Sequence, residues 1–532
     1  MVKAIVRVLN CCTIFLIVGA CTSPGSIGLD IRQKTQSDPA RLIVTSRKHA
    51  SLEFRSCSGM LRLTGERYSC GYLVAPENYA SDQSRTIKVP FLVIFPEQIA
   101  ANQYLTPVLV TGGGGPGSPQ LGNKYQYPTD DTYKTYEAFS VANGRALIIM
   151  DNRGVGFSEP ELECHYQPEL LQTDYWTRLV QANEACGNEF RINGTDLSQY
   201  NTRNAVLDIE LFRQLYAMQG VNTAQLNLYG ISYGTHIAMH YEKMFPAKTR
   251  SLVLDSVVTN KYNATENLLA SLRNGQRSLD MVFENCRASA PCLETFGEEL
   301  EMEFYHYLAA LDAQQITLDV DWPNRTDLVS VPLTASTVVA GLHGALYSGD
   351  TIATIPLMIR RLIDGSYDEF TAYLSESYLS YDFRSPFADL AFLTYLCHDQ
   401  DFAGTVDLPW PDYKLFNYWD LENNRRQTLD FCTAFDIESQ PGYSAPHTSG
   451  TPTLMLSGNF DPVTPPSNAS QEAAKYAYHW DLVFENVSHD VISHSACARN
   501  LASWFIYHLE EDLDGRYAEC ELDENRLDFE LE

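Results

Sequence analysis

The sequence predicts an α/β fold in which a mostly parallel sheet carries helices on both faces. Short apolar runs typical of buried strands alternate with segments of helical periodicity, such as residues 202–218. This alternation favours parallel strands, because a helix is the usual crossover between them. The earliest strand is expected to be an antiparallel edge. Strands are predicted at residues 86–95, 107–111, 146–150, 226–229, 251–254, 453–457 and 482–485.

A mainly helical segment interrupts this alternation at residues 261–440. The strand pattern resumes after it, so residues 51–260 and 441–532 are interpreted as two parts of one core. We interpret the insertion as a lid over the carboxyl ends of the parallel strands, where α/β folds build their sites. An independent interaction domain is the alternative. Helices in the insertion are predicted at residues 266–287, 298–315, 335–346 and 355–375.

Ser232 lies in the pentapeptide GISYG at positions 230–234, directly after the apolar run 226–229. A segment compatible with a helix follows. In a strand–turn–helix context, the G-x-S-x-G motif raises the serine hydroxyl above the sheet, and its glycines leave room for the tight backbone. We therefore interpret Ser232 as a nucleophile. The alternative is a buried strand-to-helix turn that happens to contain a small polar residue.

Two further side chains follow predicted strands, in the chain order expected for a nucleophile, an acid and a histidine. Asp461 lies just after strand 453–457, and His489 follows strand 482–485. A histidine with a pKa near ~6.5 can accept the serine proton, while a carboxylate fixes its tautomer. Taken alone, Asp461 is better interpreted as an ordinary turn residue. His494 is the competing histidine, but His489 is nearer to the strand end.

An oxyanion hole needs backbone N–H donors near the nucleophile. The residue after the serine, Tyr233, is expected to supply one donor. Gly114 or Gly115 is expected to supply the other, from four consecutive glycines that follow the predicted strand 107–111. Four glycines cost backbone entropy, which favours a role for exposed backbone over a flexible turn. A phosphate-binding loop is disfavoured because the Gly-Lys-Ser/Thr ending is missing.

Several motifs occur together in the order known from one family. GGPG at positions 114–117, DNRGVGFS at 151–158 and the GISYG pentapeptide are similar to segments of the proline iminopeptidase-like hydrolases. The segment LSGNFDPVTP at 456–465, followed by His489 and Cys497, resembles the C-terminal domain of bacterial tripeptidyl aminopeptidases. The resemblance covers most of the chain.

This resemblance implies an α/β-hydrolase fold with peptidase activity. The three residues Ser232, Asp461 and His489 carry over as the catalytic triad, with the glycine loop and Tyr233 as oxyanion donors. Asp151 and Arg153 are interpreted as braces for the loops, since a charged pair at a strand end is usually architectural.

Two positions depart from the family pattern. Gly113 stands where the proline iminopeptidases usually have His, and Ser488 stands where the family has Gly before the catalytic histidine. Neither departure removes a catalytic group. Both leave the substrate preference open.

Residues 1–20 are typical of a lipoprotein signal peptide. Lys3 and Arg7 supply positive charge, and the apolar run that follows is too short to span a bilayer comfortably. Small residues directly before Cys21 resemble a bacterial lipobox, which implies cleavage there and lipidation of Cys21; an ordinary signal peptide is the alternative. Residues 21–50 are interpreted as a tether. The expected location is the bacterial cell envelope, lipid-anchored and either periplasmic or associated with the outer membrane.

Ten of the 13 cysteines lie beyond the signal peptide and Cys21. An even set in an exported chain indicates five disulfides. Pairing of sequence neighbours is one of many connectivities that the sequence leaves open. The neighbour pairs are Cys57–Cys70, Cys164–Cys186, Cys286–Cys292, Cys397–Cys432 and Cys497–Cys520.

The formal net charge of −29 argues against nucleic acid and anionic headgroups as partners, since like charges repel. The charge favours solubility and does not identify a substrate. No metal or cofactor is expected, because CxxC pairs are missing and His236 and His240 lack the glutamate of an HExxH motif. The oligomeric state is left open.

The sequence is best interpreted as a serine exopeptidase that removes one or a few residues from peptide N-termini, of prolyl or tripeptidyl type. Such an enzyme must recognise an α-ammonium group, and carboxylates at Glu159, Asp399 and Asp401 are candidates. A carboxylic ester hydrolase is one alternative, because the same triad cleaves esters. A non-catalytic peptide-binding lipoprotein is another, although the complete triad argues against it.

Overall fold

The computed structural model describes residues 50–96, 105–124, 126–129, 131–164, 175–219, 221–259, 263–321, 328–375, 387–403, 421–440, 447–509, 511–523 and 527–532. The predicted signal peptide, Cys21 and the tether up to residue 49 lie outside these residues. Every element below belongs to one structural unit.

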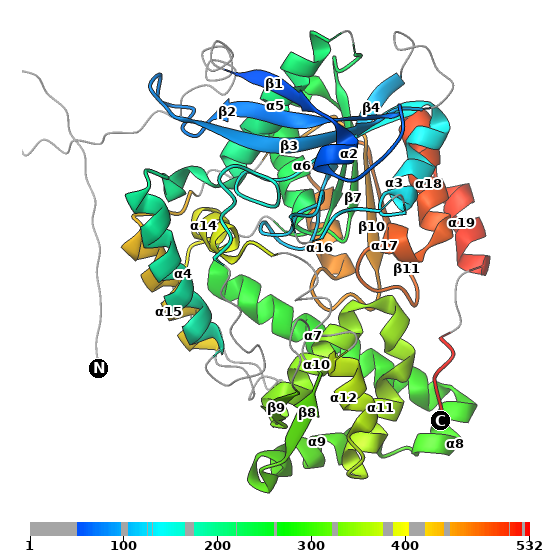
Figure 1. Ribbon diagram of the computed structural model, residues 1–532. Coiled ribbons are helices and arrows are strands. Elements are labelled where there is room, and N and C mark those ends of the chain that lie inside the picture. Colours follow the sequence, from blue (N-terminus) through cyan, green and yellow to red (C-terminus); the bar gives the residue numbers. More distant parts are fainter. Residues whose placement is uncertain are drawn as a thin grey trace, which may run out of the picture. The chain divides into compact units, whose positions relative to one another are not determined.

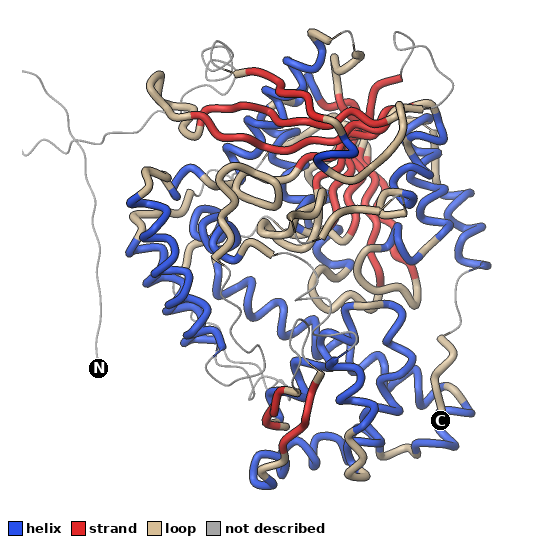
Figure 2. The backbone as a smooth tube through the Cα atoms, in the orientation of Figure 1, coloured by secondary structure: helices blue, strands red, loops and turns tan. Residues whose placement is uncertain are grey.

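Within the described residues, a nine-stranded sheet forms the centre of the hydrolase core (Figures 1 and 2). Its order is β1-β2-β3-β5-β4-β6-β7-β10-β11, and the strands from β5 to β11 run parallel. This arrangement confirms the predicted α/β-hydrolase fold. The strands are β1 (Ser51–Arg55), β2 (Tyr68–Pro76), β3 (Thr86–Ile94), β4 (Leu105–Thr111), β5 (Arg145–Met150), β6 (Leu226–Ile231), β7 (Thr249–Asp255), β10 (Thr453–Gly458) and β11 (His479–Phe484).

The strand predicted at residues 86–95 is antiparallel to both of its neighbours, as expected, but it is not an edge. β2 pairs along its whole length, and β1 pairs outside β2. The sequence pattern missed β2 because Ser69, Cys70 and Gly71 interrupt its apolar run. The predicted edge position was therefore wrong.

Helices cover both faces of the sheet (Figure 1). One face packs against α5, α6 and α16, and the other packs against α3, α17 and α18. Asn201 caps α5, because its side chain accepts a hydrogen bond from the Asn204 N–H. The helices are α2 (Cys57–Met60), α3 (Lys134–Phe139), α5 (Thr202–Ala217), α6 (Tyr233–Met244), α16 (Pro466–Ala473), α17 (Val491–His494), α18 (Ala496–Tyr507) and α19 (Asp514–Asp523).

Residues 264–375, here called the lid, have a hydrophobic cluster of their own. The segment predicted as one helix at residues 355–375 is broken, because Gly365 takes a φ of +78° that ends the first helix. A short hairpin also lies within this mainly helical region. The lid contains α7 (Ala264–Ala288), α8 (Ala290–Phe296), α9 (Leu300–Leu311), β8 (Thr317–Val320), β9 (Val329–Pro332), α10 (Ala335–Tyr347), α11 (Ile355–Ile363) and α12 (Asp368–Tyr373).

The later part of the predicted insertion packs differently from the lid. α14 (Asp389–Asp399) and α15 (Leu421–Ala434) lie beside α4 (Tyr175–Ile192), which precedes Ser232 in the chain. Their buried side chains join the cluster of the sheet and α5. The predicted range 261–440 therefore contains the lid and a second helical group that belongs to the hydrolase core. Helical periodicity is the same in both, so it could not separate them.

The structure joins the ten described cysteines in five disulfides, and these are the pairs of sequence neighbours. Their sequence separations run from 6 to 35 residues, so each bridge closes a local segment. The bridges are Cys57–Cys70, Cys164–Cys186, Cys286–Cys292, Cys397–Cys432 and Cys497–Cys520.

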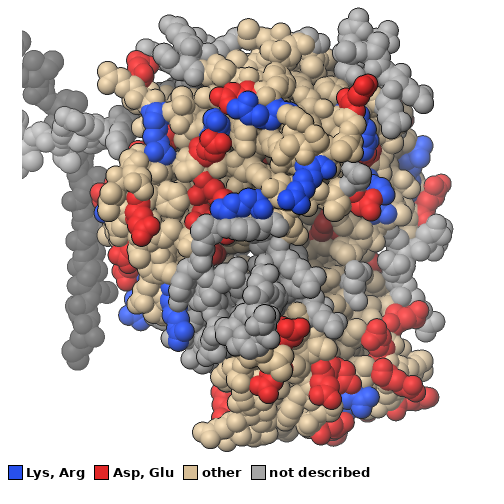
Figure 3. All heavy atoms as spheres, in the orientation of Figure 1, with Lys and Arg blue, Asp and Glu red and all other residues tan. Residues whose placement is uncertain are grey.

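The charge of the surface reflects the acidic composition of the chain. On the face drawn in Figure 3, Asp and Glu side chains predominate over the lid, while both signs are interspersed over the hydrolase core. In the described ranges, we find no helix of the length and apolarity that a membrane crossing requires.

Candidate active site

Ser232 lies at a sharp turn between β6 and α6, with φ 52° and ψ −123°. A non-glycine residue rarely adopts this conformation, which is typical of strained functional turns. The motif glycines are required by close packing. A Cβ at Gly230 would lie 2.6 Å from the Gly234 carbonyl oxygen, and a Cβ at Gly234 would lie 1.8 Å from the Thr111 carbonyl oxygen. The turn therefore exists only with glycine at both positions.

Asp461 and His489 form a hydrogen-bonded pair on neighbouring loops. β10 and β11 are adjacent and parallel, so the loops that follow them lie side by side. His489 Nδ1 lies 2.8 Å from Asp461 Oδ2, and both side chains are buried. The other ring nitrogen, Nε2, is buried and makes no hydrogen bond within the described part of the chain. This is the arrangement that a histidine base and an orienting carboxylate need.

Thr464 is a member of this cluster that the sequence interpretation missed. Its hydroxyl donates to Asp461 Oδ2 at 2.6 Å and lies 3.1 Å from His489 Nδ1. The N–H groups of Val463 and Thr464 donate to Asp461 Oδ1 at 2.8 and 2.7 Å. The available signal was the D-P-V-T sequence, in which an aspartate commonly accepts from N–H groups two and three residues later. These bonds leave the carboxylate little freedom to rotate.

Electrostatics in the pair favour an ionised carboxylate. Burial alone would raise the pKa of Asp461, but the charge of His489 and hydrogen bonds from His489 and Thr464 hold it below its ordinary value. Burial alone would lower the pKa of His489, but the charge and hydrogen bond of Asp461, with the charges of Asp490 and Asp255, raise it above its ordinary value. The imidazolium form is therefore stabilised, as a base in this position requires.

Ser232 and His489 line one cavity of about 810 Å³. The lid contributes His343, Tyr347 and Tyr373 to its walls, so the cavity lies between the lid and the hydrolase core. Burial lowers the pKa of His343 to about 4, which keeps this ring neutral at pH 7. His494 also lines the cavity, but the bond to Asp461 is made by His489.

The predicted oxyanion donors of the glycine loop differ in their position relative to the cavity. Gly113 and Gly114 line the cavity, and a Cβ at Gly113 would lie 3.3 Å from Ser232 Cβ. Gly115 is not among the lining residues and faces the Phe392 ring instead. Tyr233 is the first residue of α6, directly after Ser232. The placement therefore favours Gly113 or Gly114 over Gly115 as a partner for Tyr233.

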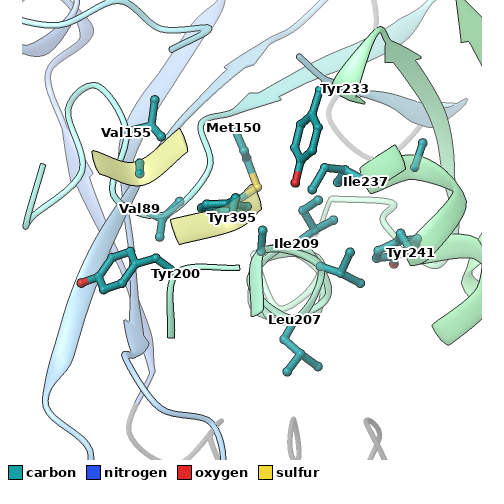
Figure 4. Close-up of a cluster of buried hydrophobic side chains, with 14 of the residues drawn as sticks. Val89, Met150, Val155, Tyr200, Leu207, Ile209, Tyr233, Ile237, Tyr241 and Tyr395 are labelled. Carbon is teal, nitrogen blue, oxygen red and sulfur yellow. The ribbon is translucent and has the colours of Figure 1, made fainter. Parts of the chain in front are cut away.

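The Tyr233 side chain points away from the cavity and into the core. Figure 4 shows its ring in the cluster that also holds Met150 and Tyr395. Its hydroxyl donates to Asp399 Oδ2 at 2.8 Å, and Thr202 Oγ1 donates to the same oxygen at 2.7 Å. The Asp399 carboxylate is thus engaged in hydrogen bonds beneath the nucleophile turn.

None of the carboxylates suggested for amine recognition lines the described cavity. Asp399 is buried under Tyr233, and Glu159 is exposed and paired with Lys88 at 3.1 Å. The Asp401 carboxylate accepts from the Ala403 N–H. Asp490, which the sequence interpretation passed over, does line the cavity. Its position beside His489 in the sequence was the signal that could have identified it.

Asp151 and Arg153 take bracing positions. Asp151 Oδ1 accepts from the N–H groups of Gln120 and Leu121 at 2.5 and 3.1 Å, which ties down the loop after the four glycines. Arg153 is fully buried and makes a two-pronged bond to Asp208 at 2.7 and 2.8 Å. Neither residue lines the cavity.

The described residues contain no group of three or more His, Cys, Asp or Glu side chains arranged to hold a metal ion. The His236 and His240 rings lie with centroids 4.1 Å apart and planes tilted by 55°, and His240 Nδ1 lies 2.6 Å from the His236 carbonyl oxygen.

Two family matches cover different parts of the chain. Residues 108–305 match the alpha/beta hydrolase fold family, and residues 420–518 match the TAP-like protein family. The first match contains Ser232, and the second contains Asp461 and His489.

Curated relatives are distant. A hydrolase named YuaR from Escherichia coli (strain K12) is 25% identical over 260 residues, which cover 47% of this chain and 48% of that protein. The tripeptidyl aminopeptidase of Streptomyces lividans is 26% identical over 220 residues, covering 39% and 38%. The matched part thus spans half or less of these two relatives. The serine protease Hip1 of Mycobacterium tuberculosis (strain H37Rv) is 23% identical over 468 residues, covering 82% and 84%.

Proposed function

We propose that this chain, a serine hydrolase of the α/β fold distantly related to tripeptidyl aminopeptidases and Hip1, is an exopeptidase. It removes one or a few residues from the N-termini of peptides. The observation that carries the proposal is that Ser232, on its strained turn, shares a cavity with His489, which is bonded to Asp461. The TAP-like match and the aminopeptidase relative favour a peptide substrate over an ester.

The proposed reaction is acyl transfer through Ser232. His489 Nε2 takes the hydroxyl proton as the serine oxygen bonds to the substrate carbonyl carbon. Backbone N–H groups of Tyr233 and of Gly113 or Gly114 stabilise the oxyanion. The C–N bond then breaks, and His489 gives its proton to the leaving amine. Water, deprotonated by the same imidazole, releases the acyl group and restores Ser232. Asp461 keeps its charge throughout and orients the ring.

Asp490 is the proposed anchor for the α-ammonium group. Among the described residues that line the cavity, it is the one carboxylate, and Lys and Arg are absent. A cavity with this charge favours a cationic group and disfavours a free carboxylate. This feature supports recognition of an N-terminus over recognition of a C-terminus.

The test compares fluorogenic Pro-, Ala- and Ala-Ala-Pro-amides with free and acetylated N-termini, alongside a short-chain ester. We expect turnover that acetylation blocks and that Ser232→Ala abolishes. Asp490→Asn should raise KM for the free amine far more than it lowers kcat. Cleavage indifferent to acetylation would indicate an endopeptidase, and ester turnover without amide turnover would indicate an esterase.

His489 and His494 provide a matched pair for the same assay. Both line the cavity, and His489 is bonded to Asp461. His489→Ala should reduce turnover by orders of magnitude, while His494→Ala should retain it within about tenfold. The reverse result would transfer the role of base to His494.

We also propose attachment to the cell envelope through lipid on Cys21. The support is the lipobox-like sequence before this residue. Cys21→Ala should move the protein from the membrane fraction to the soluble fraction and remove metabolic labelling with palmitate. An unchanged distribution and label would contradict the anchor.

A further inference from the structure

The lid contacts the loop that carries Asp461 through hydrogen bonds and hydrophobic packing. Arg277 of α7 donates from Nη1 to the Asn459 carbonyl oxygen at 2.6 Å, and from Nη2 to the Asp461 carbonyl oxygen at 2.9 Å. The residue between these two carbonyls, Phe460, is fully buried in the hydrophobic cluster of the lid. Arg277 therefore holds the backbone on both sides of Phe460, and the Phe460 side chain is itself part of the hydrophobic cluster of the lid.

The lid also contacts the loop that carries His489. Ser488 donates from its hydroxyl to the carbonyl oxygen of Leu346 at 2.5 Å, in the last turn of α10. The next residue of α10, Tyr347, stacks on the His489 ring with centroids 4.3 Å apart and planes at 28°. The Ser488 contact is buried, the Tyr347 ring is half-buried at the cavity wall, and both contacts involve the same end of α10.

We infer that the lid of this protein is a positioning element for the triad as well as a wall of the cavity. α7 holds the acid loop through Arg277, and α10 holds the histidine loop through Ser488 and Tyr347. This inference rests on the proposed function, because it assigns roles relative to Asp461 and His489. Arg277, Ser488 and Tyr347 act through the triad and do not touch the reacting atoms.

The physical reason is that the hydrogen bonds of the triad itself do not fix the imidazole plane. Within the described residues, the His489 ring has one strong hydrogen bond, from Nδ1 to Asp461, about which it can still swing. Stacking on Tyr347 restricts that rotation, and the Ser488 bond fixes the backbone from which the ring projects. A misplacement of about 1 Å costs roughly 10²-fold in rate.

The test measures the second-order rate at which diisopropyl fluorophosphate labels Ser232 in the full chain. This probe reports on the nucleophile and its base without depending on the identity of the peptide. Arg277→Met, Ser488→Ala and Tyr347→Leu should each slow labelling by roughly 10- to 100-fold. In Ser488→Ala and Tyr347→Leu, which change no charge, the acid limb of the pH profile should also move to lower pH, because a loosened Asp461 contact no longer raises the pKa of His489 as strongly.

Matched controls separate positioning from general damage. Arg273→Met makes the same change at an exposed position of α7. Tyr305→Leu alters another lid tyrosine, on α9, whose ring lies beside Phe304 and which is not among the residues that line the cavity. Both should label at close to the wild-type rate. Tyr347→Phe keeps the stacked ring and should retain labelling, and Arg277→Lys should restore part of the rate lost in Arg277→Met.

The outcomes discriminate between the two proposals. Wild-type protein that is not labelled at Ser232 would overturn the proposed function and this inference with it. Labelled wild-type protein, with unchanged rates in Arg277→Met, Ser488→Ala and Tyr347→Leu and unchanged acid limbs in the last two, would overturn the inference alone. Equal losses in Arg273→Met and Tyr305→Leu would also overturn it, because they would show a general loss of lid structure.

Discussion

The nucleophile turn and the two loops that carry Asp461 and His489 are fixed by different parts of the molecule. Ser232 is held by the sheet: its N–H donates to the Asp255 carbonyl oxygen at 2.9 Å, and Gly234 packs against the Thr111 carbonyl oxygen of β4. The other two loops follow β10 and β11, yet they are also hydrogen-bonded to the lid, through Arg277 for the Asp461 loop and through Ser488 for the His489 loop.

The nucleophile and the acid–base pair therefore depend on different kinds of structural support. The serine needs a single strained backbone conformation, which a local motif within a rigid sheet can enforce. The acid and the base must instead be placed relative to each other across two loops, which backbone hydrogen bonds from Asn459 to Phe484 and from Phe460 to Val487 join. Contacts from the lid add further constraints to both loops.

Ser232→Ala should have the largest effect. Without the hydroxyl there is no nucleophile, so kcat should fall by roughly 10⁶-fold. The sheet-held turn should persist, because alanine changes no contact of the backbone. Peptide-amide turnover and thermal melting measure the two expectations, and wild-type turnover by the variant would refute the assignment of the nucleophile.

Asp461→Asn should lower kcat by about 10⁴-fold, since an amide can leave His489 in the wrong tautomer and cannot stabilise an imidazolium. The lid contacts through the Asp461 carbonyl are unaffected by this change, so the melting temperature should shift little. A rate within tenfold of wild type would show that a different carboxylate orients the histidine.

Gly234→Ala should disrupt the nucleophile turn by steric clash. The added Cβ would lie 1.8 Å from the Thr111 carbonyl oxygen, and this oxygen belongs to the backbone of β4, which cannot easily move. We expect a loss of roughly 3 kcal/mol in the free energy of unfolding. Gly450→Ala is the control, because an added Cβ there meets nothing within 4 Å, and it should cost less than about 0.5 kcal/mol. Equal denaturation midpoints for the two variants would contradict the requirement for glycine at position 234.

The pH dependence of Ser232 labelling should show the smallest effect. His489 acts as a base only when neutral, so the rate should fall as pH decreases through its pKa. Asp461, Asp490 and Asp255 raise this pKa, which places the acid limb above about pH 6.5. Asp490→Asn removes one negative charge and should move the limb to lower pH. Asp82→Asn, on the exposed turn between β2 and β3, should leave it unchanged; an acid limb near pH 4 would argue against a histidine base.

Much of the sheet could be predicted from the sequence, because buried parallel strands are apolar along their whole length and end at recognisable polar turns. β6, β7 and β10 each contain the run predicted for them. β1 and β2 were missed, because strands at the antiparallel end of a sheet mix polar and apolar residues. The second helical group was merged with the lid because periodicity identifies a helix without identifying the cluster it packs on.

The sequence by itself determined the nucleophile motif, the order of Ser232, Asp461 and His489, and the even set of cysteines, because these depend on residue type and short spacing. The tertiary structure alone decided that Asp399 lies under Tyr233, that Asp490 lines the cavity and that Arg277 reaches the acid loop. These contacts join residues 166 to 184 positions apart in the chain for Tyr233–Asp399 and Arg277–Asp461. The physical reason is that such distances in sequence are closed only when the lid and the sheet pack, and no local pattern records that packing.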